Sequence, residues 1–542
     1  MGLSRSTVLD TLIQIHALTV EFIENKDKYG GLVPDDGAVG DFEAHNEYLF
    51  TKDYDQLPRF VHFPKKTKLA KSVLHNWPKR LKWACFYKDD YEKLINKVRL
   101  LNDVLIDLVD SDARVAIRQS TRETNTTVLH LHTRIDELVQ LTKALLPDGA
   151  TSLSKFAFSM SQCGNIADIQ EKGHFASLAF FKAVNTSVED NTYFNLQSPA
   201  VEGRAIGDLK LTKSDFHILP NFEDGSNRCE AEYQATGRSK RRVWIEWREY
   251  DPISLAQPVL KPSRIDKLIA LLSDPTKPEL LRVPLCLGYF DDPRSKENDY
   301  RRGRLGFVFE KPTAMDGGPV SLRQLLRSQP RPLLTERVAL AKAVSSCLMS
   351  LHSVNWLHKG LRSHNIIFFP EDPGERDYID FSCPFLSGFG YARPAFREDM
   401  TELPPQNPEY DMYKHPKIQR LGPWEGRQGF KRTFDIYSLG IVFTEIANWQ
   451  TIDSFLDLGN PKSMHDTDLA EIQTKLLGEK GYMQIVGAHA GSRFRDATLS
   501  CLDSKTALDV GFLDDEADVH VAAKLSRNFY HKVLRPLEEI VI

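Results

Sequence analysis

Two stretches in the second half of the chain decide the fold: Leu351 to Phe369, LHSVNWLHKGLRSHNIIFF, and Leu386 to Arg393, LSGFGYAR. An amphipathic stripe leads into the first stretch and predicts a helix, with apolar residues at Leu340, Val344, Leu348 and Leu351. Within that stretch a polar run is followed by Ile366 to Phe369, which predicts a strand. The deciding element is therefore a polar loop between a helix and a strand, and the second stretch adds a short glycine-containing loop.

Further toward the N-terminus, the sequence pattern is that of strands. The stretch Arg242 to Trp247, RVWIEW, is rich in β-branched and aromatic residues and predicts a strand. Val283 to Phe290 and Leu305 to Glu310 predict two more strands, and residues 264–273 predict a short helix. Beyond residue 320 the chain becomes mostly helical. Strands followed by helices are typical of an α+β fold.

The length and composition limit the class of protein. At 542 residues the chain exceeds a single hydrophobic core, so two or three domains are expected. Apolar residues make up 41% and charged residues 27%, as in ordinary globular proteins. The 70 basic and 74 acidic residues give a net charge of −4, which argues against a nucleic-acid partner.

Cysteine usage and hydropathy predict a cytoplasmic protein. The seven cysteines are scattered and form no Cys-x-x-Cys pair or metal-binding spacing, so we expect reduced thiols and no metal site. The first 25 residues lack a basic stretch followed by an apolar core, so no secretory signal is expected. The sequence contains no run of about 18 apolar residues, so no membrane-spanning helix is expected.

The first 150 residues predict a helical bundle. Amphipathic stretches predict helices at 6–28, 91–109 and 126–146, and the last of these stops at Pro147. Their apolar stripes are short and separate, which favours a compact antiparallel bundle over a coiled coil. Residues 59–99 carry twelve Lys or Arg against three Asp or Glu. This asymmetry predicts either a surface for an acidic membrane or partner, or a solvated helix face.

This helical region has a resemblance of its own. The segment Arg80 to Leu108, RLKWACFYKDDYEKLINKVRLLNDVLIDL, resembles the later helices of the fungal HeLo domain, the prion-inhibition and propagation domain at the N-terminus of the HET-s protein. The residues that carry the resemblance are Lys82, Trp83, Ala84, Tyr91, Leu94, Asn102 and Asp103. The helix at 8–31 with its Tyr-Gly terminator resembles a middle part of that domain. HeLo domains begin with membrane-active apolar helices further upstream, so a partial domain is expected, and pore formation is not carried over.

The second half of the chain resembles a protein kinase in the order and spacing of four motifs. The run His358 to Asn365, HKGLRSHN, resembles the catalytic loop, and Gly388 to Gly390 stands where the metal-binding Asp-Phe-Gly would be. Tyr413 to Pro416 stands at the Ala-Pro-Glu position. Asp435 to Val442, DIYSLGIV, resembles the start of the large central helix. The resemblance implies that Asp435 caps this helix and hydrogen-bonds the loop backbone.

The residues that phosphoryl transfer requires are replaced together. A kinase needs a glycine-rich phosphate cradle, a lysine on a strand and two aspartates. Here only Gly225 and Gly237 precede the strand, Glu246 stands at the lysine position, and the aspartates are replaced by Gly360 and Gly388. Arg248 lies on the same strand face as Glu246, because side chains alternate along a strand, and is an alternative phosphate-binding residue.

Scaffold positions of the same motifs persist at His358, Asn365, Phe389, Gly390 and Asp435. The resemblance implies that His358 is structural and packs near Phe389. Asn365 would either bond the loop backbone or serve as a weak Mg²⁺ ligand, and Arg248 and Asn365 are the two candidates for cofactor binding. No catalytic residue and no metal ligand is otherwise predicted.

The predicted architecture is an N-terminal α-helical bundle followed by a two-lobed protein-kinase-like fold, in the α+β class. The predicted limits are a partial HeLo-like domain at 1–146, a connector at 147–205, an N-lobe at 206–312 and a C-lobe at 313–542. The kinase resemblance covers residues 206–542.

These resemblances imply a pseudokinase rather than an enzyme. Such a module would bind a protein partner or act as a switch beside the helical domain, in fungal recognition or cell-death signalling. No cofactor is expected, and ATP with Mg²⁺ would require an atypical binding mode.

Two alternatives remain open at the level of sequence. The first is an atypical ATP-dependent protein kinase that uses the polar residues left at the site, namely Asn365, Arg362, Arg248 and Asp380. Asp380 is also expected as an ordinary turn residue. The second is a membrane-active HeLo effector, which the basic stretch 59–99 supports and the missing upstream helices oppose.

Overall fold

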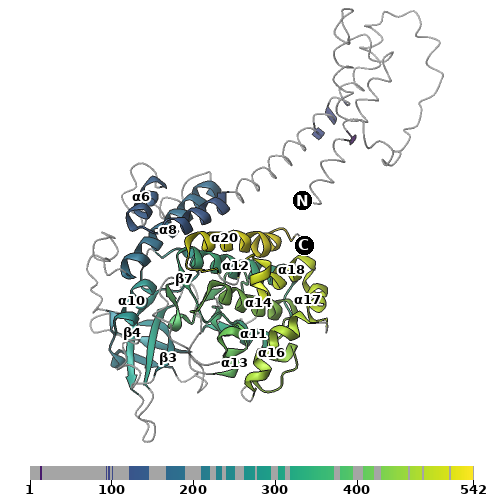
Figure 1. Ribbon diagram of the computed structural model, residues 1–542. Coiled ribbons are helices and arrows are strands. Elements are labelled where there is room, and N and C mark those ends of the chain that lie inside the picture. The colour runs from purple at the N-terminus through teal and green to yellow at the C-terminus, as the bar shows by residue number, and fades with distance from the viewer. Residues whose placement is uncertain are drawn as a thin grey trace, which may run out of the picture. The chain divides into compact units, whose positions relative to one another are not determined.

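The structure is a computed structural model. It describes residues 121–145, 166–189, 209–219, 228–234, 240–250, 262–274, 277–293, 303–311, 318–370, 379–394, 407–419, 429–461, 464–478, 481–511 and 514–540, with isolated helical positions between 13 and 101. The chain divides into two compact units, Met1–Ser120 and Thr121–Ile542 (Figure 1). The predicted helices at 6–28 and 91–109 and the basic stretch 59–99 lie essentially outside the described residues. The predicted domain limits stay predictions.

The second unit mixes helices and sheet, as predicted for the α+β class. Its largest sheet has five antiparallel strands in the order β1-β2-β3-β5-β4. The strands are β1 Phe216–Ile218, β2 Arg228–Tyr233, β3 Arg241–Tyr250, β4 Cys286–Pro293 and β5 Gly303–Glu310. Helix α10 (Pro262–Leu272) and the short turn η9 (Glu279–Leu281) lie between β3 and β4. The fourth strand begins three residues later than predicted, because Pro284 has no N–H to donate to a ladder.

Strand β3 separates two hydrophobic clusters. Val243 and Ile245 point to a small cluster, whereas Trp244 points to the main core and packs on Phe309 and Phe369, with ring centroids 5.3 and 4.9 Å away. This alternation follows from the two-residue period of a strand. Glu246 and Arg248 share the face of Trp244, so the sheet presents both charged side chains toward the rest of the unit.

Helices make up most of the chain after residue 320. They are α11 Leu322–Ser328, α12 Leu334–Ser353, α13 Pro408–Asp411, α14 Arg432–Asn448, α15 Ile452–Phe455, α16 Asp466–Leu477, α17 Tyr482–Ala490, α18 Ser492–Leu502, α19 Ser504–Ala507, α20 Val519–Phe529 and α21 Arg535–Glu538, with a π-helical turn at Tyr530–Leu534 before α21. Helix α14 is buried along its whole length. Gly440 allows α18 to approach it, since a Cβ there would lie 3.0 Å from atoms of Cys501 and Leu502.

Short strands frame the polar loop that follows α12. Strands β6, β8 and β9 form one small sheet, and β7 pairs with β10 in another. Their bounds are β6 Val320–Ser321, β7 Trp356–Leu357, β8 Ile366–Phe368, β9 Phe385–Leu386 and β10 Arg393–Pro394. The loop thus leaves β7 and enters β8, so both of its ends are fixed by backbone pairing.

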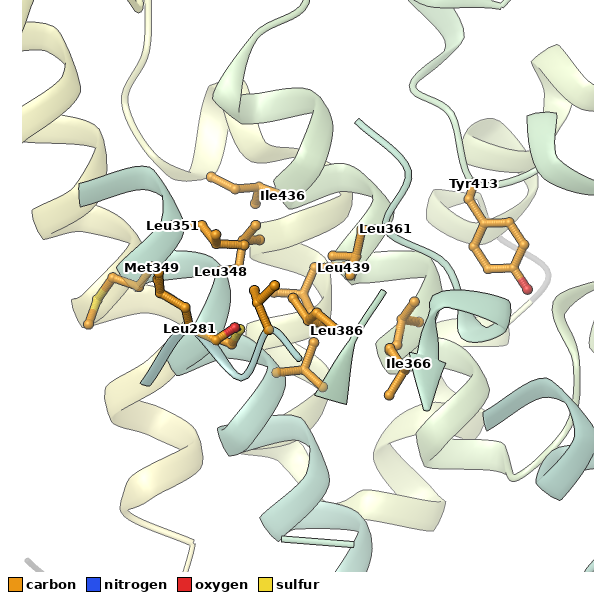
Figure 2. Packing of buried hydrophobic residues seen from close by; sticks show 14 of the residues in the cluster. Leu281, Leu348, Met349, Leu351, Leu361, Ile366, Leu386, Tyr413, Ile436 and Leu439 are labelled. Carbon is orange, nitrogen blue, oxygen red and sulfur yellow. The ribbon is translucent and has the colours of Figure 1, made fainter. Parts of the chain in front are cut away.

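One hydrophobic core joins α12, the loop and α14. Figure 2 shows Leu348 and Leu351 of α12 facing side chains from the loop region and from α14; the residues that meet there include Leu361, Leu386, Ile436 and Leu439. These side chains are at most 1% exposed. Burying each one fully stabilises the fold by about 1.5–3 kcal/mol relative to leaving it exposed. The predicted stripe of α12 is therefore the core face that positions the loop.

The second unit begins with helices that precede the sheet in the chain. They are a helix at residues 121–131, α6 (Ile135–Leu145) and α8 (Ile166–Glu189), and α8 packs on α6, α10 and α12 (Figure 1). The single helix predicted at 126–146 is wrong, because the helix is interrupted at 132–134. Leu129 and Leu138 are nine residues apart, which would place them on opposite faces of a continuous helix at about 100° per residue. The interruption lets both enter the same core, where each is at most 1% exposed.

Among the described residues, no helix has both the length and the apolar character needed to cross a membrane.

Candidate functional site

The backbone of the polar loop between β7 and β8 is hydrogen-bonded to a carboxylate of α14. Asp435 is fully buried and accepts hydrogen bonds from the backbone N–H groups of His358 and Lys359, both at 2.9 Å. The ring Nε2 of His352 lies 3.4 Å from the same carboxylate. Asp435 was expected to cap the helix, and this is wrong: the N-cap is Lys431, and Asp435 lies within the first turn. A cap would satisfy the helix's own N–H groups, whereas this carboxylate satisfies those of the loop.

His358 is a structural residue of the loop. Its ring is buried and lies 4.6 Å from the ring of Phe389, and its Nδ1 accepts a hydrogen bond from the N–H of Gly360 at 3.2 Å. Burial lowers the pKa of His358 to about 4, so the ring is neutral at neutral pH. A neutral ring that accepts at Nδ1 fits a residue that shapes the turn.

Asn365 ties the end of the loop to its middle. Its Nδ2 donates to the carbonyl of Gly360 at 2.6 Å, and its Oδ1 accepts from the guanidinium of Arg228 at 2.7 Å. Its backbone carbonyl accepts from the N–H of Ser387 at 2.9 Å. Both ends of the amide are used, one by loop backbone and the other by a cation.

The two glycines at the predicted aspartate positions differ in the space around them. At Gly360 a Cβ would lie 3.4 Å from the carbonyl oxygen of Gly388, which is tight but tolerable. At Gly388 a Cβ would lie 2.2 Å from Asn365 Nδ2, and the residue has φ of +80°, a left-handed conformation that side chains disfavour. An aspartate therefore cannot stand at 388 unless Asn365 moves.

Arg228 connects the sheet to both loops. Its guanidinium contacts Glu246 at 3.1 Å, donates to Asn365 Oδ1 at 2.7 Å, and also donates to the hydroxyl of Ser387 and the carbonyl of His364. Glu246 completes the arrangement by accepting from the N–H of Gly388 at 2.9 Å. The side chains of Arg228 and Glu246 are only 17% and 8% exposed. We call this set of five contacts the Arg228 clasp.

Sequence reasoning singled out Glu246 but missed Arg228. The two residues are direct partners in the register of β2 with β3. Cross-strand partners have Cβ atoms about 5 Å apart, so opposite charges at these positions pair once the strands do. The only signal in the sequence was a basic residue at the start of one strand and an acidic residue within the next. The register that joins them comes from the sheet.

The remaining candidates lie around this clasp or away from it. Arg248 is buried on the Glu246 face of β3, and its Cδ would be 3.2 Å from a Cβ at Gly390. The guanidinium of Arg362 lies over the ring of Tyr410, 3.9 Å from its centroid. Asp380 is exposed and accepts from the backbone and hydroxyl of Ser382 at 2.8 and 2.6 Å, as a turn residue does. Gly225 and Gly237 lie outside the described residues.

A second buried polar group lies beside the loop. The hydroxyl of Tyr413 donates to Glu445 at 2.6 Å and contacts the hydroxyl of Ser363 at 2.8 Å. Glu445 also accepts from the N–H of Ile452 at 2.9 Å. Burial raises the pKa of Glu445 to about 7. The group links the loop to the C-terminal end of α14.

The chemistry available at the loop is that of cations and amides. In the parts of the chain that the structure describes, no group of three or more His, Cys, Asp or Glu side chains is placed to hold a metal ion. The carboxylate of Glu246 is paired with a guanidinium, and Gly360 and Gly388 carry no side chain. The arrangement holds the sheet against the loops.

Two family models match parts of the chain. Residues 2–141 match HeLo, described as prion-inhibition and propagation, so the N-terminal part of the chain carries a HeLo domain. This match confirms the HeLo resemblance, whereas a partial domain and the kinase resemblance stay predictions. Residues 309–541 match a domain of unknown function, DUF7580, which covers the polar loop, Gly388 and α14. No curated protein matches the chain.

Proposed function

We propose that residues 206–542 form a protein-kinase-like module that does not transfer phosphate and acts as a binding or switch module beside the HeLo domain. Three features of the fold support the kinase likeness. The five-stranded sheet precedes a mostly helical part, α10 follows β3, and the loop of His358 to Asn365 is held by a buried aspartate of a central helix. A kinase has these parts in this order.

The observation that carries the loss of catalysis is the Arg228 clasp. In a kinase, the region between strand lysine, loop asparagine and metal-binding aspartate holds nucleotide phosphates and Mg²⁺. Here Arg228 contacts Glu246, Asn365 and Ser387 directly. In the proposed assignment, Glu246 stands at the lysine position and Asn365 at a metal-ligand position, so the charge of Arg228 takes the place of the metal and lysine charges, and the protein itself satisfies it. A guanidinium held by several charge-assisted hydrogen bonds is costly to displace.

The two replaced aspartates support the same proposal. Asn365 fills the space that a side chain at Gly388 would need, and its amide is committed to Gly360 and Arg228. Restoring one carboxylate would therefore not restore a metal site. The losses at Glu246, Gly360 and Gly388 form one consistent rearrangement that ties the sheet to the loops.

The biological role proposed for the pair of domains is fungal recognition or cell-death signalling in the cytoplasm, with a protein as the partner. The support is the HeLo match at residues 2–141 and its position before the kinase-like module. In this proposal the kinase-like part senses a partner and the HeLo part passes the signal on.

A nucleotide titration tests the loss of catalysis. The full-length chain is titrated with ATP, with and without Mg²⁺, and its melting temperature and phosphate incorporation from labelled ATP are measured. We expect no metal-dependent shift and no incorporation. In Arg228→Ala the clasp is removed, and a shift with ATP that appears only in this variant would support occlusion by Arg228. Arg241→Ala is the matched control, because Arg241 is an exposed residue of the neighbouring strand.

Two results would support the alternatives instead. A Mg²⁺-dependent shift in the native chain, with incorporation that is lost in Asn365→Ala, would show an atypical kinase and overturn the proposal. Leakage of anionic liposomes on addition of the purified chain would support a membrane-active HeLo effector.

A further inference from the structure

Two helices at the start of the second unit bury ionisable groups in its interior. We call the helix at residues 121–131 and α8 the connector helices; of these two, only α8 lies within the predicted connector at 147–205. Lys182 of α8 is fully buried, and its amino group donates to the backbone carbonyl of Leu129. The charged form of a buried amine is unfavourable, because it loses the water that would solvate it. Burial, with the nearby charge of Arg432, lowers the pKa of Lys182 to about 7.

His130 of the other connector helix is buried in the same place. It is 1% exposed, and neither ring nitrogen has a hydrogen-bond partner among the described residues. Burial lowers its pKa well below the ordinary value, and the charges of Arg432, Lys182 and His352 act in the same direction. A buried histidine in this environment is neutral. Leaving both of its ring nitrogens without a hydrogen bond is unusual in a protein interior.

The groups that face these two residues come from α12 and α14. Arg432 begins α14, is fully buried, and bonds the backbone carbonyl of Glu516 and the side chain of Asn355. His352 of α12 faces Asp435. Arg432 carries a positive charge near Lys182 and His130. A second positive charge on either residue would be repelled by Arg432, and this repulsion is strong in a low-dielectric interior.

The packing of the connector helices is incomplete as well. A partly open pocket of about 100 Å³ lies between them and α12, lined by Leu129, Phe175 and Met349 among others. Asn185 donates to the carbonyl of Val354 at 2.9 Å, but its own Oδ1 has no partner among the described residues. Close-packed contacts leave few such gaps between helices and few unpaired polar atoms. This interface is therefore less stable than its apolar area alone would make it.

We propose that the connector helices are held on α12 and α14 by a proton-linked contact: proton uptake by Lys182 and His130 releases them, and with them the segment that leads back to residues 1–120. The proposal concerns only this contact and does not depend on whether the kinase-like module binds nucleotide.

The direction follows from proton binding in the two states. In the packed state each group has a lower pKa than in water, so the packed state binds fewer protons than the released state. Release therefore becomes easier as the pH falls. Lys182 contributes between its ordinary pKa of 10.5 and its packed pKa of about 7. His130 contributes below the ordinary histidine value of 6.5.

Two further histidines lie at the edges of the contact. His174 of α8 lines the pocket, and burial lowers its pKa, so it acts in the same direction as His130. His531 lies 3.1 Å from Glu123 at the other edge. Both members of this pair are partly exposed, at 33% and 26%, and pairs as exposed as this one contribute little to stability.

Hydrogen exchange of the full-length chain tests the proposal. The exchange of α8 amides is measured relative to that of α14 amides in the same sample, which cancels the intrinsic effect of pH. We expect the α8-to-α14 ratio to rise on going from about pH 9 to about pH 7 and again to about pH 5.5, by up to tenfold per pH unit for each proton taken up. Equal ratios at the three pH values in the native chain would overturn the proposal.

Variants assign the two steps. Lys182→Met should slow α8 exchange at neutral pH and remove the first step. His130→Phe should reduce the second step, and His130→Phe with His174→Phe should remove it. His132→Gln is the matched control, since His132 lies two residues from His130 but is 41% exposed and faces Glu137. A loss of either step in His132→Gln, or faster α8 exchange in Lys182→Met, would refute the role of the buried groups.

Discussion

The space around Gly388 allows a sharp prediction: Gly388→Ala will destabilise the second unit far more than backbone strain alone. The new Cβ would lie 2.2 Å from Asn365 Nδ2 and 2.4 Å from its Cγ. Asn365 must then move and lose its bond to Gly360 and its bond from Arg228. We expect about 1 kcal/mol from the positive φ, about 1 from the neutral hydrogen bond and about 2 from the charged one, for a loss of about 4 kcal/mol.

Gly459 supplies the matched control. It also has a positive φ, of +73°, but a Cβ there would meet nothing within 4 Å. Gly459→Ala should therefore cost only the strain, about 1 kcal/mol. Free energies of unfolding are measured by urea titration, with a check that the slope of the transition is unchanged. Equal losses in the two variants would refute the steric reasoning.

The double variant Asn365→Ala with Gly388→Ala tests whether Asn365 is the residue that a Cβ at position 388 would clash with. In Asn365→Ala the side chain that blocks position 388 is already gone. Adding Gly388→Ala to it should cost only about 1 kcal/mol more, so the two substitutions should be non-additive by about 3 kcal/mol. Losses that add within about 0.5 kcal/mol would show that Asn365 is not the obstacle.

Three further predictions concern other parts of the unit. Arg228→Ala should lower the free energy of unfolding by about 3–5 kcal/mol, because it leaves Glu246 buried without a counter-charge. The control Arg241→Ala should lower it by less than about 1 kcal/mol. Similar losses in urea titrations of the two variants would contradict the clasp. Leu348→Ala should lower the stability by about 2–5 kcal/mol, because Leu348 is fully buried. Leu333→Ala should be nearly neutral, because Leu333 is 71% exposed. Thermal unfolding measures both variants, and a small loss at Leu348 would contradict the core assignment. Glu445 has a pKa raised by burial to about 7, so the folded state binds more protons than the unfolded state between about pH 4.5 and pH 7, and stability falls by about 3 kcal/mol as the pH rises through this range. In Glu445→Gln this loss should disappear, and an unchanged pH profile of the melting temperature would refute the assignment.

The local periodicity of the chain predicted many of its elements. The stripe Leu340, Val344, Leu348 and Leu351 became the buried face of α12, and RVWIEW became the centre of β3. These segments were predictable because a residue's side-chain direction within one helix or strand depends only on its spacing. The same reasoning failed at 132–134, where the helix is interrupted to bring Leu129 and Leu138 into one core.

The candidate site was only half visible in the sequence. Its replaced positions, Glu246, Gly360 and Gly388, could be found by their place in recognisable motifs. The contacts of Arg228 that replace a phosphate-binding site could not be found from motifs. Arg228 reaches Glu246 through the register of β2 with β3, and it reaches Asn365 and Ser387 through the approach of the sheet to the loops.

The sequence by itself determined most of the helices and strands that lie among the described residues, the HeLo likeness and the absence of aspartates from the two loops. Each of these depends on residues that are close together in the chain. Only the tertiary structure decided that Asp435 holds the loop from within α14, that Asn365 fills the space beside Gly388, and that Lys182 is buried. A lysine after two phenylalanines in an amphipathic helix gives no local sign of its burial. Its surroundings are set by Leu129 and Arg432, which lie 53 residues before it and 250 residues after it in the chain.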